Sequence, residues 1–258
     1  MDLSGKTAIV TGASKGIGLA VAEALAEAGM NVTMTARGQE GLDRAVAGLN
    51  ARDGGRGLAY ACDVRDLEQQ RGCVAATVAA FGGVDLLVAN AAVGAREKVD
   101  ELDPTTWSRI VDTNLTGVFY SVAVAVAELK RSRGMIVTIG SLAGVNFFAG
   151  GAAYNASKFG LLGFTQAAML DLRDHGVRVS TIMPGSVATT FSDRAVTEAD
   201  GWKLQPSDIA QTVLYLLGMP AEALPSKVEL RPARVNQAGV NQAGVNQAGA
   251  GQAKANPA

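Results

Sequence analysis

The chain has 258 residues, 48% hydrophobic and 18% charged, so it is long enough to bury a sizeable core and is not wholly disordered. Its 23 Lys and Arg residues balance 24 Asp and Glu residues, which leaves no cationic excess for binding a phosphate backbone. One histidine and two cysteines argue against a multi-histidine metal centre, a four-cysteine zinc site and a disulfide scaffold. We therefore expect neither a nucleic-acid partner nor a bound metal.

The N-terminal residues lack a long apolar segment before the first expected strand, so we expect no signal peptide. No run of residues approaches the ~18 apolar positions of a membrane span. Two cysteines without a scaffold pattern fit a reducing compartment. The sequence thus predicts a soluble cytoplasmic protein without a membrane partner.

Apolar, β-branched segments alternate with segments of helical periodicity along most of the chain. Strands are expected at residues 7–10, 32–36, 57–62, 84–89, 135–139, 177–183 and 227–230. Helices are expected at residues 16–29, 39–52, 67–81, 104–131, 153–174 and 206–217. Such alternation with short connections is typical of an α/β fold whose doubly wound parallel sheet has helices on both faces. We expect one three-layer αβα domain over residues 1–232, with its ligand crevice beyond the carboxyl ends of the strands.

The end of the chain has a different composition. The pentapeptide Val-Asn-Gln-Ala-Gly occurs three times in succession over residues 235–249. A period of five matches neither a helix face nor a strand, and these small residues cannot offset the entropy lost on ordering. We expect residues 233–258 to be a low-complexity tail, disordered from Val235 and without a chemical role.

A glycine-rich segment follows the first expected strand and opens the first helix. Its spacing is Gly-x-x-x-Gly-x-Gly, which alone also fits an ordinary turn. Glycines at this junction let the chain turn sharply and let a pyrophosphate approach the backbone at the N-terminus of the helix. The position between strand and helix therefore predicts a dinucleotide site. Its expected binding residues are Gly12, Ser14, Lys15, Gly16, Ile17 and Gly18.

The residues after the second expected strand indicate which dinucleotide is bound. An acidic residue about 20 positions beyond the glycines would bind a ribose 2′-hydroxyl and select NAD. Here the strand ends in Arg37, and no Asp or Glu stands there. Arg37 and Lys15 could bracket a 2′-phosphate, so we expect NADP(H).

Tyr154 and Lys158 stand four residues apart on an expected helix and so share one face. Alone, this pair is a weak motif that also fits two neighbours on the surface. An ammonium about 4 Å from a phenol would lower its pKa by roughly three units, from ~10 to near 7, where it can exchange protons. Ser141 follows the fifth strand, where its hydroxyl could hold a substrate carbonyl.

Taken in order and at these spacings, the motifs resemble the short-chain dehydrogenase/reductase family, in its 3-oxoacyl-carrier-protein-reductase-like branch, over about residues 5–220. The resemblance implies a Rossmann-type fold. The matching residues are Thr11-Gly12-x-x-x-Gly16-x-Gly18, Asp63-Val64, Asn90-Ala91, Asn114, Ser141, Tyr154-x-x-x-Lys158 and Pro184-Gly185-x-Val187-x-Thr189.

The resemblance also implies roles for single residues. Tyr154 is the expected proton donor or acceptor, Lys158 lowers its pKa and binds the nicotinamide ribose, and Ser141 positions the carbonyl. Asn114 is expected to support a water-linked proton relay to Lys158. Cofactor contacts are further expected from Asp63 to the adenine, from Asn90 near the ribose, from Val187 and Thr189 to the carboxamide, and from Val64, Pro184 and Gly185.

The chain departs from the family pattern at several points. Ala89 stands where an asparagine is usual, which suggests a lost hydrogen bond, and Ala92 stands where glycine is usual. Two long helices that pair in the family's dimers are expected, although alanines 123, 125 and 127 could equally be internal core. The usual glycine-rich C-terminal segment is absent, so a homodimer is expected and a tetramer is in doubt.

These observations predict an NADPH-dependent oxidoreductase that reduces a carbonyl compound, with ketones and 3-oxoacyl thioesters as candidate small-molecule substrates. An NAD-linked alcohol dehydrogenase and a dinucleotide-binding scaffold or sensor without turnover are the alternatives. A serine hydrolase is the weakest alternative, because the only histidine, His175, is expected at a helix end.

Overall fold

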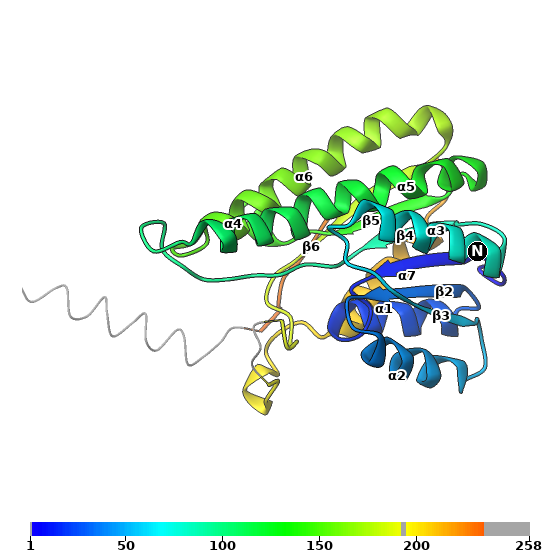
Figure 1. Ribbon diagram of the computed structural model, residues 1–258, viewed down its shortest axis with the longest axis horizontal. Helices are drawn as coiled ribbons and strands as arrows, with labels where there is room; N and C mark the ends of the chain where they lie inside the picture. Colours follow the sequence, from blue (N-terminus) through cyan, green and yellow to red (C-terminus); the bar gives the residue numbers. More distant parts are fainter. Residues whose placement is uncertain (1, 192–194, 235–258) are drawn as a thin grey trace, which may run out of the picture.

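A seven-stranded sheet runs through the centre of the computed structural model, which describes residues 2–191 and 195–234 (Figure 1). In spatial order its strands are β3 (Gly57–Ala61), β2 (Asn31–Ala36), β1 (Thr7–Thr11), β4 (Leu86–Ala89), β5 (Met135–Ile139), β6 (Arg178–Pro184) and β7 (Lys227–Leu230). All neighbouring strands are parallel. The chain starts in the middle of the sheet and proceeds first to one edge and then to the other, as in a doubly wound sheet.

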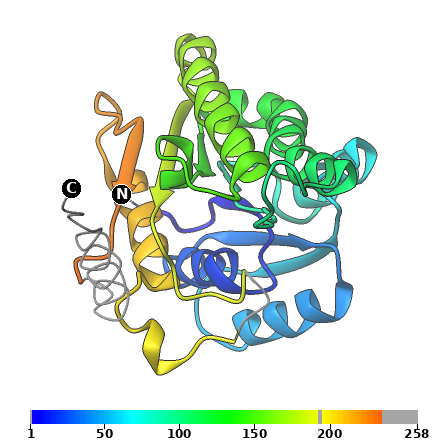
Figure 2. The ribbon, with the colours of Figure 1, turned by 90° about the vertical axis from the view of Figure 1, so that its left-hand side faces the viewer.

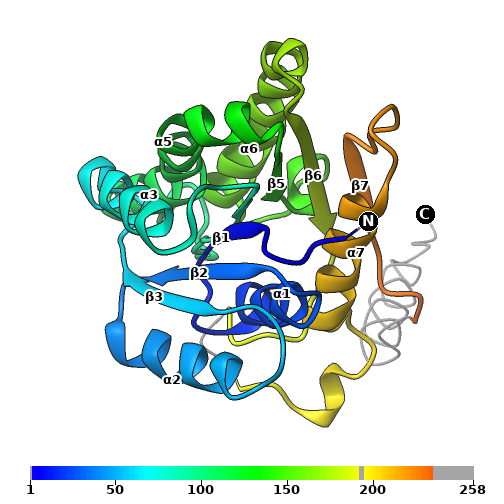
Figure 3. The same ribbon diagram turned by 90° about the vertical axis from the view of Figure 1, so that its right-hand side faces the viewer.

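Helices cover both faces of this sheet (Figure 3). One layer holds α1 (Gly16–Glu27), α2 (Gln39–Asn50) and α7 (Pro206–Gly218), and the other holds α3 (Leu67–Phe81), α4 (Pro104–Val111), α5 (Gly117–Ser132) and α6 (Ala152–Leu172). Along β1, Ala8 and Val10 pack with the first layer, whereas Ile9 between them packs with the second. Both faces of the strand are therefore buried, which explains its unbroken apolar sequence. The expected three-layer α/β architecture is confirmed.

The helix expected over residues 104–131 is divided by one π-helical turn, η1 (Asp112–Thr116). The turn carries the fully buried Asn114. The residues that the turn buries, Thr113 and Asn114, are polar, and the sequence analysis did not predict the insertion. Three short 3₁₀ turns complete the described elements: η2 (Leu142–Gly144), η3 (Arg173–His175) and η4 (Glu198–Asp200).

The continuous helical stretch Pro104–Ser132 is long and apolar enough, by length and composition alone, to cross a membrane. It is the one such stretch within the described residues. Its side chains at Val122, Ala125 and Leu129 are buried in the cluster that also holds Ile9 and Ile136 of the sheet. We therefore assign this stretch to the core of the α/β fold.

The repeat-containing end of the chain, residues 235–258, lies outside the described residues, as do residues 192–194. The expectation of a disordered tail and the domain boundary at residue 232 therefore stay predictions.

Candidate active site

The loops after six of the parallel strands lie at one edge of the sheet, which faces the viewer in Figure 2. These loops line one cavity of about 610 Å³. It lies where β1 and β4 separate, the point at which the strand order reverses, as doubly wound sheets predict. Its volume is in the range of cofactor sites. Sixteen of the expected site residues line it: Gly12, Ser14, Lys15, Gly16, Ile17, Arg37, Asp63, Val64, Asn90, Ser141, Tyr154, Lys158, Pro184, Gly185, Val187 and Thr189. Gly18 and Asn114 lie behind this lining.

The glycine-rich turn between β1 and α1 leaves no room for a side chain at Gly12 or Gly18. Gly12 has a φ of +66°, and a Cβ there would lie 2.9 Å from the Cα of Ala91. A Cβ on Gly18 would lie 2.4 Å from the carbonyl oxygen of Gly12. No described side chain caps the N-terminus of α1, so its first N–H groups remain available to an anion. The turn therefore fits a phosphate cradle.

Thr11 and Asn90 hold this turn against the end of β4. The Oγ1 of Thr11 accepts hydrogen bonds from the backbone N–H groups of Asn90 and Ala91, both at 3.0 Å. The Nδ2 of Asn90 donates to the carbonyl oxygens of Thr11 at 2.8 Å and Gly12 at 3.2 Å. The Asn90 side chain thus braces the turn, and its expected contact with a ribose stays a prediction.

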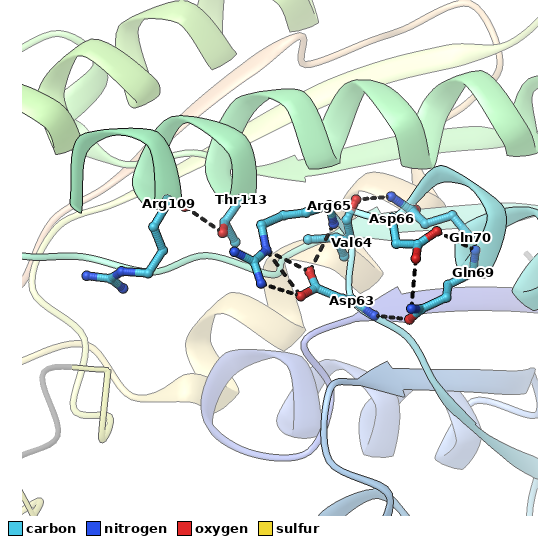
Figure 4. A network of polar contacts seen from close by, with 8 residues as sticks. All are labelled: Asp63, Val64, Arg65, Asp66, Gln69, Gln70, Arg109 and Thr113. Atoms are coloured by element: carbon cyan, nitrogen blue, oxygen red, sulfur yellow. Dashed lines mark hydrogen bonds and ion pairs between the residues drawn. The ribbon is translucent and has the colours of Figure 1, made fainter. Parts of the chain in front are cut away.

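Asp63, expected at the adenine end, is paired with a residue that the sequence analysis missed (Figure 4). Arg65 donates from Nη2 to Oδ2 of Asp63 at 2.6 Å and from Nε to Oδ1 at 3.0 Å. These bonds, with a smaller contribution from the charge of Arg37, hold the pKa of the Asp63 carboxyl below its usual value. Arg65 also lines the cavity, and its place directly after Asp63-Val64 was the available signal.

The chain around Asp63 and Val64 is fixed by the start of α3 (Figure 4). Asp66 caps that helix by accepting from the N–H groups of Glu68 and Gln69. Gln69 Oε1 accepts from the N–H of Asp63 at 2.9 Å, and Gln70 donates to the carbonyl oxygen of Val64. These bonds hold both residues at the cavity wall.

The N-terminus of α2 lies beside the glycine-rich turn. A Cβ on Gly41, in the first turn of α2, would lie 3.5 Å from the Cβ of Ser14. The helix begins after Gly38, and no described side chain caps it. Free N–H groups therefore lie close to Arg37 and Ser14, an arrangement that suits a second phosphate group.

Lys158 and Tyr154 of α6 both reach the cavity, beside Ser141. Lys158 is almost fully buried and donates from Nζ to the carbonyl oxygen of Ile139 at 2.9 Å. Burial lowers the pKa of Lys158 to about 8. Its Nζ lies 5.8 Å from the centroid of the Tyr154 ring.

The expected pKa of Tyr154 near 7 is wrong for the protein by itself. Burial raises the pKa of this phenol above its usual value, and a hydrogen bond with Ser141 opposes that rise only in part. The reason is that the enclosing protein removes water from the phenolate, while the Lys158 ammonium bonds to the Ile139 carbonyl. At neutral pH the Tyr154 phenol therefore keeps its proton.

Ser141 and Asn114 hold the walls around Tyr154. Ser141 caps η2 by accepting from the N–H of Ala143 at 3.1 Å. Asn114 binds the backbone of Val93 at two points, accepting from its N–H at 2.8 Å and donating to its carbonyl oxygen at 2.9 Å. Asn114 also donates to Ser157 Oγ at 3.1 Å. The Asn114 side chain therefore positions the cavity wall at Val93, and the expected water relay stays a prediction.

Phe191 and Lys203, which were not among the expected site residues, also line the cavity, both from the segment after β6. That segment returns to the site: Leu204 pairs with Val187, and Thr189 lies near Gly16. His175 is exposed in η3 and is not among the lining residues. Ser141 consequently has no histidine partner, which argues against a serine hydrolase.

Comparison with known proteins agrees with this geometry. The sequence model of the family described as short chain dehydrogenase matches residues 6–200. The chain is 37% identical over 223 residues to 3-oxoacyl-acyl-carrier-protein reductase FabG of Vibrio cholerae serotype O1, covering 86% of this chain and 88% of that one. It is also 37% identical over 223 residues to dehydrogenase/reductase SDR family member 4 of Oryctolagus cuniculus, covering 85% and 84%.

Solved structures show the same fold. An alcohol dehydrogenase from Thermococcus sibiricus, complexed with 5-hydroxy-NADP, has a TM-score of 0.84 at 28% identity, with 88% of this chain and 97% of that one covered. A metagenomic short-chain oxidoreductase in complex with NADP has a TM-score of 0.80 at 34% identity, with 91% and 100% covered. The chain therefore belongs to the short-chain dehydrogenase family and is an NAD(P)-dependent dehydrogenase or reductase.

The tight approach at Gly18 predicts that Gly18→Ala destabilises the fold. Its Cβ would meet the backbone oxygen of Gly12, so we expect the free energy of unfolding to fall by about 1–3 kcal/mol. Gly48→Ala is the matched control, because nothing lies within 4 Å of a Cβ there and a helical alanine should stabilise by roughly 0.5–1 kcal/mol. Urea denaturation measures both changes, and equal effects of the two substitutions would contradict the close packing of the turn.

The buried ammonium of Lys158 predicts a stability that depends on pH. With its pKa lowered from 10.5 to about 8, the folded chain binds fewer protons than the unfolded chain between these values. Relative to Lys158→Met, the wild type should therefore gain about 3 kcal/mol of unfolding free energy as the pH rises through this window. Urea titrations at pH 7 and pH 10 measure the gain. The exposed Lys98→Met is the control, and a difference independent of pH would rule out the buried charge.

Proposed function

We propose that this enzyme reduces ketones to alcohols with NADPH, and that Tyr154 donates the proton to the carbonyl oxygen. One observation carries the proposal. The Tyr154 phenol, hydrogen-bonded to Ser141 and close to the buried Lys158, faces the same cavity as the glycine-rich turn. A raised pKa keeps this phenol protonated at neutral pH, which is the state that a proton donor needs.

In the proposed mechanism the hydroxyls of Ser141 and Tyr154 hold the carbonyl oxygen of the substrate. The reduced nicotinamide, when bound, supplies the hydride for the carbonyl carbon. As negative charge develops on the oxygen, Tyr154 gives up its proton, and the ammonium of Lys158 stabilises the phenolate that remains. Tyr154 then regains a proton from solvent, and in the proposal this proton passes through a relay that includes Asn114 and Lys158.

The preference for NADPH is supported by the charges around the cavity. Its described lining has five cationic side chains and one acidic one, Asp63; the cations are Lys15, Arg37, Arg65, Lys158 and Lys203. No acidic lining residue stands at the end of β2, where a ribose 2′-hydroxyl would be bound. The uncapped N-terminus of α2 adds donors at the same place. These features favour a 2′-phosphate.

The substrate class is a ketone, with 3-oxoacyl thioesters as the first alternative to test. The name of the Vibrio cholerae relative supports the thioester, whereas the name of the Thermococcus sibiricus structure supports an alcohol or simple ketone. An NAD-linked alcohol dehydrogenase is disfavoured by Arg37. A scaffold without turnover is disfavoured by the assembled Ser141, Tyr154 and Lys158.

We further propose that the enzyme forms a homodimer through α5 and α6 in the cytoplasm. Phe119, Phe159 and Leu170 on these helices are 49%, 45% and 50% exposed, an apolar area that a partner would cover. Of the alanines on α5, residue 125 is core, while residues 123 and 127 are exposed and allow close approach. Both cysteines are free thiols, as a reducing compartment requires. Sedimentation equilibrium distinguishes the dimer from a monomer or a tetramer.

Tyr154→Phe tests the proton donor. Without the hydroxyl we expect kcat for ketone reduction to fall about 10²- to 10⁴-fold. NADPH oxidation with a panel of ketones and 3-oxoacyl thioesters measures kcat, and NADPH fluorescence confirms that the cofactor still binds. Tyr215→Phe removes an exposed phenol on α7 and should leave kcat unchanged. Equal turnover by the Tyr154 variant and the wild type would end the proposed mechanism.

Arg37→Ala tests the cofactor preference. Loss of a charge-assisted hydrogen bond to a 2′-phosphate should raise the dissociation constant of NADPH by roughly 10- to 100-fold and leave that of NADH nearly unchanged. Arg44→Ala, an exposed cation paired with Glu40 on α2, is the control. Fluorescence titration gives both constants. Comparable binding of NADH and NADPH by the wild type would refute the preference.

A further inference from the structure

The ring of Phe191 covers one side of the Tyr154 phenol. The two ring centroids lie 6.0 Å apart with their planes inclined by 60°, an arrangement in which aromatic rings are in contact. Phe191 lines the same cavity as Tyr154 and Ser141. Because 44% of its surface is exposed, one part of the ring packs on protein while another part is open to a ligand.

Gly94 makes this position of the ring possible. A Cβ on Gly94 would lie only 2.8 Å from Cε1 of Phe191 and 3.8 Å from Cδ2 of Tyr154. The ring therefore lies directly against bare backbone. That backbone is not free to withdraw, because Asn114 holds the adjacent Val93 with two hydrogen bonds. The Phe191 ring therefore cannot move toward Gly94 to make room for a bulky substrate.

We propose that Phe191, packed on Gly94, determines which ketones reach Tyr154: it stacks on a flat substituent beside the carbonyl and excludes one that is branched there. The inference rests on the proposed reductase function and names aryl ketones as the favoured substrates. An aromatic face attracts a second flat ring in an offset or tilted arrangement. A substituent branched beside the carbonyl cannot lie flat on the exposed part of the Phe191 ring, so it keeps the carbonyl farther from Tyr154.

The test compares two ketones of different thickness with NADPH: acetophenone, which is flat, and 3,3-dimethyl-2-butanone, which is branched beside the carbonyl. We expect Phe191→Ala to lower the ratio of their kcat/KM values, flat over branched, by about 10-fold. Phe191→Tyr keeps the ring and should keep the ratio within about twofold. Phe147→Ala removes a ring that is 87% exposed and not part of the cavity lining, and it should leave the ratio unchanged.

Gly94→Ala provides a second variant that retains the ring. The added methyl group displaces Phe191, so we expect the ratio to fall in the same direction as in Phe191→Ala. If the two residues act as one unit, the double variant should match Phe191→Ala and not the product of the single effects. Urea denaturation and NADPH fluorescence confirm that each variant is folded and binds cofactor.

A ratio in Phe191→Ala within twofold of the wild type would overturn the inference while leaving the reductase function intact. If the wild type turns over neither ketone, dissociation constants measured by NMR in the presence of NADP⁺ give the same comparison, and acetophenone should bind several-fold more weakly to Phe191→Ala. Absence of both turnover and binding for every ketone tried would overturn the proposed function and this inference together.

Discussion

At the point where β1 and β4 diverge, backbone groups lose their partners in the sheet, and Thr11 and Asn90 replace those partners. The Thr11 hydroxyl accepts hydrogen bonds from two backbone N–H groups after β4. The Asn90 amide donates to the carbonyl oxygens of Thr11, the last residue of β1, and of Gly12. Buried polar backbone groups are costly when unpaired. This reciprocal set of bonds therefore fixes the ends of β1 and β4 relative to each other at the cavity wall, where the rest of the site lines the same cavity.

Burial acts in opposite directions on the two titratable groups of α6. It raises the pKa of the Tyr154 phenol and lowers the pKa of the Lys158 ammonium to about 8, because in both cases the neutral form is favoured. A protonated phenol close to a cation of modest pKa is suited to giving a proton and regaining one at neutral pH. The same enclosure that excludes water from these groups thus keeps the phenol in the protonated state that the proposed proton donor needs.

The charge around the cavity is distributed along its length. Arg37 follows β2 at the uncapped start of α2, and the Asp63–Arg65 pair follows β3. Lys158 of α6 bonds to the carbonyl oxygen of Ile139 at the end of β5. The aromatic ring of Phe191 lies at the Tyr154 end. A long anionic cofactor and a small uncharged substrate would therefore find separate regions of one cavity.

The sequence by itself determined the parallel α/β fold and the positions of the strands. Apolar periodicity and the positions of glycines depend only on neighbouring residues, and both can be read without the tertiary structure. The sequence also located the glycine-rich turn and Ser141, because residues at the carboxyl ends of parallel strands meet at one edge of the sheet. Tyr154 and Lys158 were located by their four-residue spacing, which places them on one face of a helix. Ala89 shows what this approach leaves open. Its side chain suggests that a hydrogen bond of the family pattern is lost, and only the structure shows that Thr11 and Asn90 form hydrogen bonds beside it.

Only the tertiary structure decided the remaining features, which depend on residues far apart in the chain. The role of the π-turn at Asn114 is visible only in the hydrogen bonds between Asn114 and Val93. The pKa of Tyr154 depends on how much water the whole fold removes from it, which spacing to Lys158 cannot reveal. The packing of Phe191 on Gly94 joins segments nearly one hundred residues apart, a contact that no local pattern encodes.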